Sequence, residues 1–279
     1  MVRRAALVGA WARSGRAPAA LLRWHLPLTA RLALVLEDPD SGAIIDRGPP
    51  LDEQLRAARG QPLPTLRPRV EGPLLRLTSR RQPLDPLLLG DPLRLGVARP
   101  ALLLAGPRRL LLADRDDPAQ LRALLAEAER HRDADDRVLI EPLEAQPSAA
   151  GGFGWAALRL PPEHPHAGWL ARLRVWQDIE DDADSALPGD SRLRMHQRAG
   201  APGGVLTLAP WPDAPCRLPP ADLYAISTDV GPRALWGDEL LDLLGAHTRP
   251  DPTTWPPRFI SPGLPPEAVA RAQAAGEPL

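Results

Sequence analysis

The chain has 279 residues, enough for one large domain or two smaller ones, and its net charge of −1 gives no global field that would attract nucleic acid or anionic lipid. It contains no lysine and no asparagine, which excludes a Schiff-base lysine, a phosphate-loop lysine and N-glycosylation. With the single cysteine Cys216, it has neither an intrachain disulfide nor a cysteine-rich zinc site.

The first half predicts mostly short strands. Proline accounts for 36 of the 279 residues and is barred from central strands, so we expect brief strands, many turns and long loops. One short helix is expected over 51–58. Apolar runs bounded by turn residues predict strands over 31–37, 43–46, 74–78, 93–97, 101–105, 109–113 and 137–143.

Residues 117–131 predict an amphipathic helix. Asp117 is a favourable N-cap, Pro118 suits the first helical position, and Gln120 stands at the reciprocal position of a capping box. An apolar stripe at helical spacing follows, formed by Leu121, Leu124, Leu125 and Ala128.

The segment from Arg108 to Arg130, a strand followed by this capped helix, resembles the end of a bacterial pleckstrin-homology-like domain. In that family a final strand leads into one helix that plugs the sheet. The resemblance covers about one twelfth of the chain. It implies a lipid- or protein-docking module for the first half.

A linker is predicted over 144–152, where small residues, proline and glycine cluster. Only two of the chain's aromatic residues precede this segment and the others follow it. We therefore predict two domains, a β-rich domain over 1–147 with a C-terminal helix and a mixed, tryptophan-rich domain over 148–279. The predicted fold class is α+β: a β-rich first half closed by the helix over 117–131, and a mixed second half with many proline-rich loops.

In the second half, strands are expected over 155–160, 204–208 and 222–227. The pattern over 167–176 fits a helix or a strand. A helix is predicted over 232–244, with Trp236, Leu240, Leu243 and Leu244 on one face, and a second over 265–275.

The strongest candidate for chemistry is a pair of histidines, His164 and His166, followed by an acidic run and by His196. Histidines at i and i+2 point to one side of a strand, a spacing that several metallohydrolases use. With Asp182 and His196, the pair predicts a metal-dependent hydrolase as an alternative function. The competing interpretation is a proline-rich loop followed by a solvated acidic surface.

Gly189-Asp190-Ser191 is similar to the GDS block of one esterase group. That group also uses a catalytic-site asparagine, and this chain has no asparagine. The chain also lacks a G-x-S-x-G nucleophile elbow.

Tryptophans give the second half its candidate partner surface, because tryptophan is enriched at interfaces and hot spots. The competing interpretation is that these side chains fill the core. The five candidates are Trp169, Trp176, Trp211, Trp236 and Trp255.

Together these patterns favour a non-catalytic binding or accessory subunit of a bacterial multiprotein assembly, with another protein subunit as its partner. All 34 positive charges are arginine, which we attribute to a GC-rich genome, and a local arginine face is kept as a second alternative for nucleic-acid binding. We expect no cofactor, no membrane span and a cytoplasmic location.

Overall fold

The computed structural model describes residues 4–7, 26–27, 33–37, 67–78, 95–106, 108–132, 140–147, 153–251 and 258–279. These residues form both sheets and helices, the α+β content that the sequence predicts. The chain divides into two compact units. Unit 1 comprises Met1–Ala17 and Leu21–Leu173, and unit 2 comprises Pro18–Ala20 and Arg174–Leu279.

Unit 1 contains a three-stranded antiparallel sheet in the order β1-β3-β2, formed by β1 (Arg4–Leu7), β2 (Leu26–Pro27) and β3 (Ala33–Glu37). Its larger sheet has the order β4-β5-β7-β6-β8-β9 and is antiparallel throughout. The strands are β4 (Arg67–Glu71), β5 (Leu74–Thr78), β6 (Pro100–Gly106), β7 (Arg109–Asp114), β8 (Leu143–Pro147) and β9 (Phe153–Ala157).

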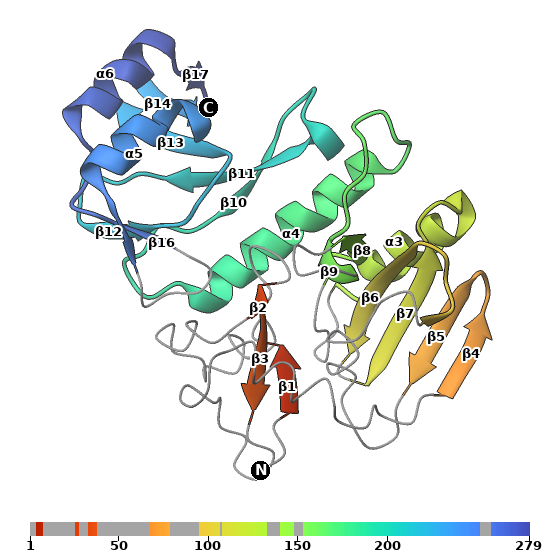
Figure 1. Cartoon of the computed structure of the whole chain (residues 1–279). Coiled ribbons are helices and arrows are strands. Elements are labelled where there is room, and N and C mark those ends of the chain that lie inside the picture. The colour runs from red at the N-terminus through yellow and green to blue at the C-terminus, as the bar shows by residue number, and fades with distance from the viewer. Residues whose placement is uncertain are drawn as a thin grey trace. The chain divides into compact units, whose positions relative to one another are not determined.

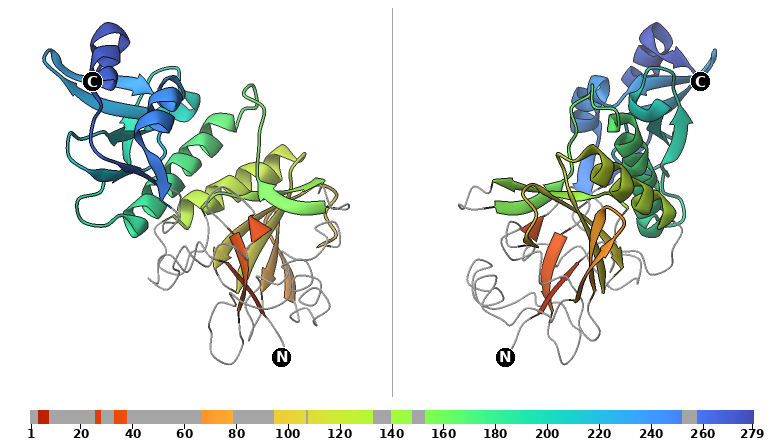
Figure 2. Two further views of the ribbon diagram at one scale, coloured as in Figure 1. Left: turned by 60° about the vertical axis from the view of Figure 1, so that its left-hand side comes forward. Right: turned by 90° about the vertical axis from the view of Figure 1, so that its right-hand side faces the viewer.

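Helix α3 (Pro118–Arg130) packs against the six-stranded sheet, over β6 and β7 and towards β5 (Figures 1 and 2). Its predicted apolar stripe is completely buried, and Asp117 caps it by accepting the N–H groups of Ala119 and Gln120. The capping differs in one detail from the prediction. The Gln120 side chain accepts the backbone N–H of Asp114 and donates from Nε2 to the carboxylate of Asp117 at 3.0 Å, so it ties both the cap and the end of β7 to the helix without accepting the backbone N–H of Asp117.

The prediction of a linker over 144–152 is corrected at residues 144–147 by this sheet, and residues 148–152 lie outside the described residues. Residues Leu143–Pro147 form β8, which pairs with β6 and β9. The side chain of Glu144 is 1% exposed and is held by Arg115, by the N–H of Arg159 and by Gln146. The predicted domain boundary at 147/148 lies between the paired strands β8 and β9, and the two compact units divide at Leu173/Arg174.

Helix α4 (Ala167–Ser185) resolves the ambiguous pattern over 167–176 in favour of a helix, and the division between the units falls within it. Its second half carries the acidic run that we predicted as a solvated surface. Asp181 and Asp182 are buried there, at 9% and 3% exposure, so at these two positions that interpretation was wrong.

Unit 2 contains a five-stranded sheet in the order β10-β11-β13-β14-β17, in which β11 and β13 are parallel and the other pairs antiparallel (Figure 1). Its strands are β10 (Arg194–Gln197), β11 (Val205–Pro210), β13 (Leu223–Thr228), β14 (Gly231–Trp236) and β17 (Glu277–Pro278). A second sheet in the order β12-β16-β15 is formed by β12 (Cys216–Leu218), β15 (Arg249–Asp251) and β16 (Arg258–Ser261).

Short helices complete unit 2: the 3₁₀ turns η4 (Pro202–Gly204) and η5 (Asp238–Leu240), and the helices α5 (Leu241–His247) and α6 (Pro266–Ala275). Helix α6 packs on β13 and β14 and contributes Ala268 and Ala272 to the core. That core also holds Trp211 and Tyr224, which are 2% and 1% exposed.

The predicted helix over 232–244 is corrected in its first half. Gly231–Trp236 pairs along its whole length with β13, and the helix begins only at Leu241. The strand ends at Trp236, and at the following Gly237 a Cβ atom would lie 2.4 Å from the carbonyl oxygen of Ala221. Backbone pairing with a buried strand outweighs a helical spacing of apolar residues here, because each pair of strands satisfies buried N–H and C=O groups.

The other predicted strands and helices are confirmed, displaced or outside the described residues. Strands over 74–78, 101–105, 109–113, 204–208 and 222–227 and the helix over 265–275 are confirmed, within a residue or two at the ends. The strand expected over 155–160 lies at 153–157, the one over 31–37 begins at Ala33, and residues 95–97 and 140–142 are not strand. The predicted elements over 43–46 and 51–58 lie outside the described residues.

Candidate functional site

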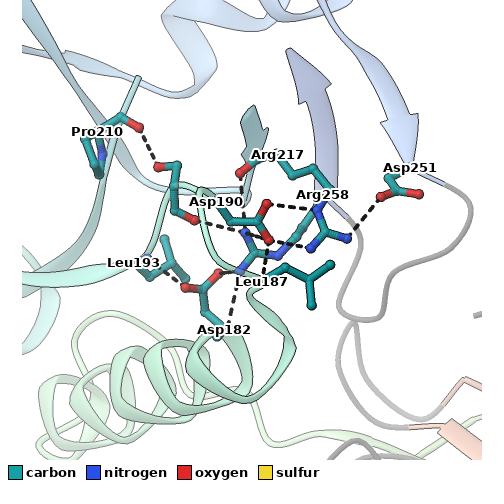
Figure 3. A network of polar contacts seen from close by, with 9 residues as sticks. Asp182, Leu187, Asp190, Leu193, Pro210, Arg217, Asp251 and Arg258 are labelled. Carbon is teal, nitrogen blue, oxygen red and sulfur yellow. Dashed lines mark hydrogen bonds and ion pairs between the residues drawn. The ribbon is translucent and has the colours of Figure 1, made fainter. Parts of the chain in front are cut away.

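The most deeply buried polar cluster of unit 2 surrounds Arg258, the first residue of β16, whose side chain is 1% exposed (Figure 3). Its Nη2 donates to Oδ1 of Asp182 on α4 at 2.5 Å and to the backbone oxygen of Asp182 at 3.2 Å. Its Nη1 donates to the backbone oxygen of Ser191 at 2.9 Å. The other oxygen of Asp182 accepts from the N–H of Leu193 at 2.8 Å. Arg258 therefore joins α4 to β16 and to the loop before β10.

A second arginine extends this cluster towards the surface. Arg217 on β12 binds Asp190 with both ends of its guanidinium group, Nε to Oδ1 at 3.0 Å and Nη2 to Oδ2. Its Nη1 lies 3.4 Å from Asp251 on β15 (Figure 3). The carboxylates of Asp182, Asp190 and Asp251 are thus all held by guanidinium groups, and the arrangement has the geometry of a structural cross-link.

The pKa values of this cluster reflect both burial and pairing. Burial alone would raise the pKa of Asp190, but the hydrogen bonds from Arg217 and from the N–H of Leu187, with the charges of Arg217 and Arg258, outweigh it and hold that pKa below its usual range. Burial lowers the pKa of Arg258, opposed by the charges of Asp182 and Asp190. Charged carboxylates and charged arginines hold this cluster together at neutral pH.

Replacing Asp190 by Asn tests this pairing. Because the pKa of Asp190 is lowered on folding, its contribution to stability is complete above the unfolded-state value near 3.9 and is lost as the pH falls through the folded-state value. We expect Asp190→Asn to be less stable than wild type at pH 7 and to lose less stability between pH 5 and pH 2. Urea unfolding at a series of pH values measures both effects. If wild type and Asp190→Asn lost the same stability between pH 5 and pH 2, the assignment of a lowered pKa to Asp190 would be contradicted.

The residues predicted to bind a metal are divided between the two units. His164 and His166 precede α4 in unit 1, in a turn and not on the strand that their spacing suggested. The Nδ1 atom of His164 accepts the backbone N–H of His166 at 3.1 Å, and burial is the main cause that lowers the pKa of His164. The other two residues belong to unit 2. His196 lies on β10, and Asp182 lies in the part of α4 that follows Leu173. Within the described ranges, no three His, Cys, Asp or Glu side chains form a group that could hold a metal ion.

Ser191 of the GDS sequence is 4% exposed, and its Oγ donates to the carbonyl oxygen of Pro210. Its neighbour Asp190 is bound to Arg217 as described. Neither side chain is arranged here as an exposed nucleophile with a base.

The five tryptophans of the predicted partner surface differ in how deeply they are buried. Trp211 lies inside the core, where its Nε1 donates to Oγ of Ser261 at 3.0 Å, so at this position the core interpretation holds. Trp236 is partly buried under the guanidinium group of Arg198, 4.6 Å from its ring centre. Trp169 and Trp176 on α4 are partly buried, and the buried Nε1 of Trp169 has no hydrogen-bond partner in the described structure. Trp255 lies outside the described residues.

A charged pocket opens in unit 1 at the C-terminal end of α3, with a volume of about 160 Å³. Leu74 and Leu111 line it together with side chains of mixed charge. Those charged and polar side chains are Glu71, Arg76, Arg109, Glu127, Arg130 and His131. They come from β4, β5, β7, the last turn of α3 and its C-cap, so the sheet and the helix end together form the pocket.

Two of the pocket's arginines are paired with its glutamates. Arg76 lies 2.9 Å from Glu71, and Arg130 bonds with Glu127. The side chain of Arg109 instead faces His131, with its Nη2 atom 3.0 Å from Nδ1 and 2.6 Å from Nε2 of the ring. Among the described residues, no carboxylate lies within ion-pair distance of Arg109. Glu127 also lies 3.2 Å from Nε2 of His131, and the hydrogen bond from Arg76, helped by the charge of Arg109, lowers the pKa of Glu71. Arg109 therefore has acidic groups nearby, but makes no direct ion pair with a carboxylate of the described residues.

Sequence reasoning did not find this pocket. Its residues are spread over four elements, and the arginines were attributed to genome composition. One signal was present: Arg76 interrupts the apolar run of β5, and a charged residue at a position that alternation assigns to a covered face needs a partner or a ligand.

Comparisons with models of protein families, with curated proteins and with solved structures found no match for this chain. No described helix is long and apolar enough to cross a membrane.

Proposed function

We propose that this chain is a non-catalytic binding subunit of a bacterial protein assembly, and that it contacts its partner protein through the charged pocket at the end of α3. The observation that carries the proposal is Arg109, a partly buried guanidinium group in an open pocket that makes no direct ion pair with a carboxylate of the described residues. A desolvated charge without a counter-charge is costly, and a partner that supplies the counter-charge removes that cost.

The buried acids of unit 2 support the same proposal. Asp182 is the acid of the predicted metal site, and Asp182, Asp190 and Asp251 are each bound to an arginine. General acids, general bases and metal ligands need an accessible lone pair or proton. These groups are better suited to holding β12, β15 and β16 to α4 than to a reaction.

The polar character of the pocket also fits a protein partner. Interfaces that form and dissociate contain few charges at the centre and complementary charges at the rim, and arginine is enriched at the positions that carry most of the binding energy. Two leucines line the pocket together with arginines and glutamates, so it offers both apolar contact and charges that a partner can complement.

The test is reconstitution of a complex with the full chain. Affinity capture from the native host first supplies candidate partners. We then expect one purified candidate to form a complex of fixed stoichiometry on size-exclusion chromatography, and hydrogen exchange in that complex to slow at residues 67–78 and 108–132. If the chain formed no complex with any candidate and catalysed a reaction by itself, the proposal would be contradicted. Slower exchange confined to the regions of Trp176 and Trp236 would place the interface in unit 2 instead.

A further inference from the structure

Arg76 and Arg109 lie on neighbouring strands and on the same face of the sheet. In the register of β5 and β7, Arg76 is opposite Leu111, so Arg109 is its diagonal neighbour two residues away. Diagonal neighbours in antiparallel strands are about 7–8 Å apart, a separation that long side chains span. Two guanidinium groups can therefore reach one ligand group placed between them.

The two arginines differ in how their donors are used. The Nε atom of Arg76 is buried and has no hydrogen-bond partner in the described part of the chain, although the same side chain is paired with Glu71. Arg109 contacts a histidine ring and no carboxylate among the described residues. Because neighbouring atoms cover that Nε atom, the donors that a bound oxygen atom can reach are those of Arg109.

The charge balance of the pocket favours a ligand with one negative charge. Three arginines and two glutamates line the pocket, which leaves a formal surplus of one positive charge with His131 not counted. A phosphate group carries about −1.5 to −2 at neutral pH and would be repelled by Glu71 and Glu127. A carboxylate carries a single charge and fits the planar fork of a guanidinium group.

We infer that this pocket binds one carboxylate group between Arg76 and Arg109. The volume of about 160 Å³ is far more than the 10–15 Å³ that one water molecule needs, and it admits a side chain the size of glutamate. Resting on the proposed function, we assign the source of the carboxylate to an acidic side chain of the partner protein. A free dicarboxylic acid presents the same chemistry, and the experiment separates the two.

The experiment titrates the full chain with four probes by calorimetry: the blocked peptide Gly-Glu-Gly, its Gly-Gln-Gly counterpart, succinate and inorganic phosphate. We expect the glutamate peptide to bind and the glutamine peptide not to bind, because only the former carries the charge. Equal binding of the two peptides, tighter binding of phosphate, or no binding of either carboxylate probe would each overturn the inference.

Two variants locate the binding. Arg109→Gln is expected to weaken glutamate-peptide binding by about tenfold or more, and Arg109→Lys by less, because lysine keeps the charge and loses the fork. Arg122→Gln is the matched control: Arg122 is an exposed arginine of α3 outside the pocket, and binding is expected to change less than twofold. Circular dichroism verifies the fold of each variant. If Arg109→Gln and Arg122→Gln weakened peptide binding equally, binding would depend only on the net charge of the protein, and the assignment of the site to this pocket would be overturned.

The results for this site and for the proposed function can be told apart. Succinate binding with no partner complex would keep the carboxylate site and remove the protein-binding function. A partner complex that Arg109→Gln leaves intact would keep that function and remove the assignment of its carboxylate to this pocket.

Discussion

Replacing Arg258 by Met is expected to lower the free energy of unfolding of unit 2 by about 3–5 kcal/mol. Methionine preserves much of the side-chain volume but leaves the buried carboxylate of Asp182 without its counter-charge. The backbone oxygens of Asp182, Ser191 and Arg217 would each lose a donor as well. Urea unfolding at pH 7, with hydrogen exchange to assign the loss to unit 2, measures the change.

A double-mutant comparison separates charge from packing. Asp182→Asn keeps an acceptor for the N–H of Leu193 and removes the unpaired charge, so Arg258→Met combined with Asp182→Asn should be less destabilised than the sum of the single variants by at least about 1 kcal/mol. Arg271→Gln is the surface control, since Arg271 pairs with Asp242 in an exposed position, and we expect no measurable loss. If Arg258→Met proved neutral, the cluster would not be a structural cross-link, and a catalytic role for its acids would have to be reconsidered.

Replacing Gly263 by Ala is expected to cost at least about 3 kcal/mol. The residue has a φ of 135°, and a Cβ atom would lie 2.2 Å from the carbonyl oxygen of Asp213. Any shift that relieves the overlap also moves the carbonyl oxygen of Gly263, which accepts from Nε1 of Trp211 at 3.2 Å. The change should therefore appear both in the midpoint of thermal unfolding and in the near-ultraviolet signal of the buried tryptophan.

Gly245 provides the matched control for that substitution. It lies in helix α5, is exposed, and has nothing within 4 Å of the position of a Cβ atom. Gly245→Ala should stabilise the protein by about 0.5–1 kcal/mol, because alanine loses less backbone freedom on entering a helix. A similar loss at both glycines would show that the cost at Gly263 does not come from its conformation.

The elements that the sequence predicted well are those with a complete local signal. Strands β6 and β7 are uninterrupted apolar runs bounded by turn residues, and α3 begins with an aspartate cap followed by proline and an apolar stripe. These signals are local because capping and periodicity act within one or two turns.

The sequence predictions failed where contacts between residues far apart in the chain determine the local structure. Strand β8, with the sequence Leu-Glu-Ala-Gln-Pro, has few strand-forming residues, yet it pairs on both sides and its buried glutamate is held by Arg115, 29 residues earlier in the chain. The pocket depends in the same way on a strand register and a helix end that no sequence window contains. The histidine pair was visible from the sequence, but whether its lone pairs face a ligand or the backbone depends on the turn it adopts.

The burial of Cys216 makes it a reporter of local opening. The thiol lies on β12 and is 9% exposed, and burial, supported by the charge of Asp190 and opposed by Arg258, raises its pKa. A protonated, covered thiol reacts slowly with maleimides and disulfide reagents, because the thiolate is the nucleophile. Since the chain has no second cysteine, the rate of labelling in the folded protein counts the openings of β12 alone. Unit 2 can therefore be followed by one chemical reaction without any engineered label.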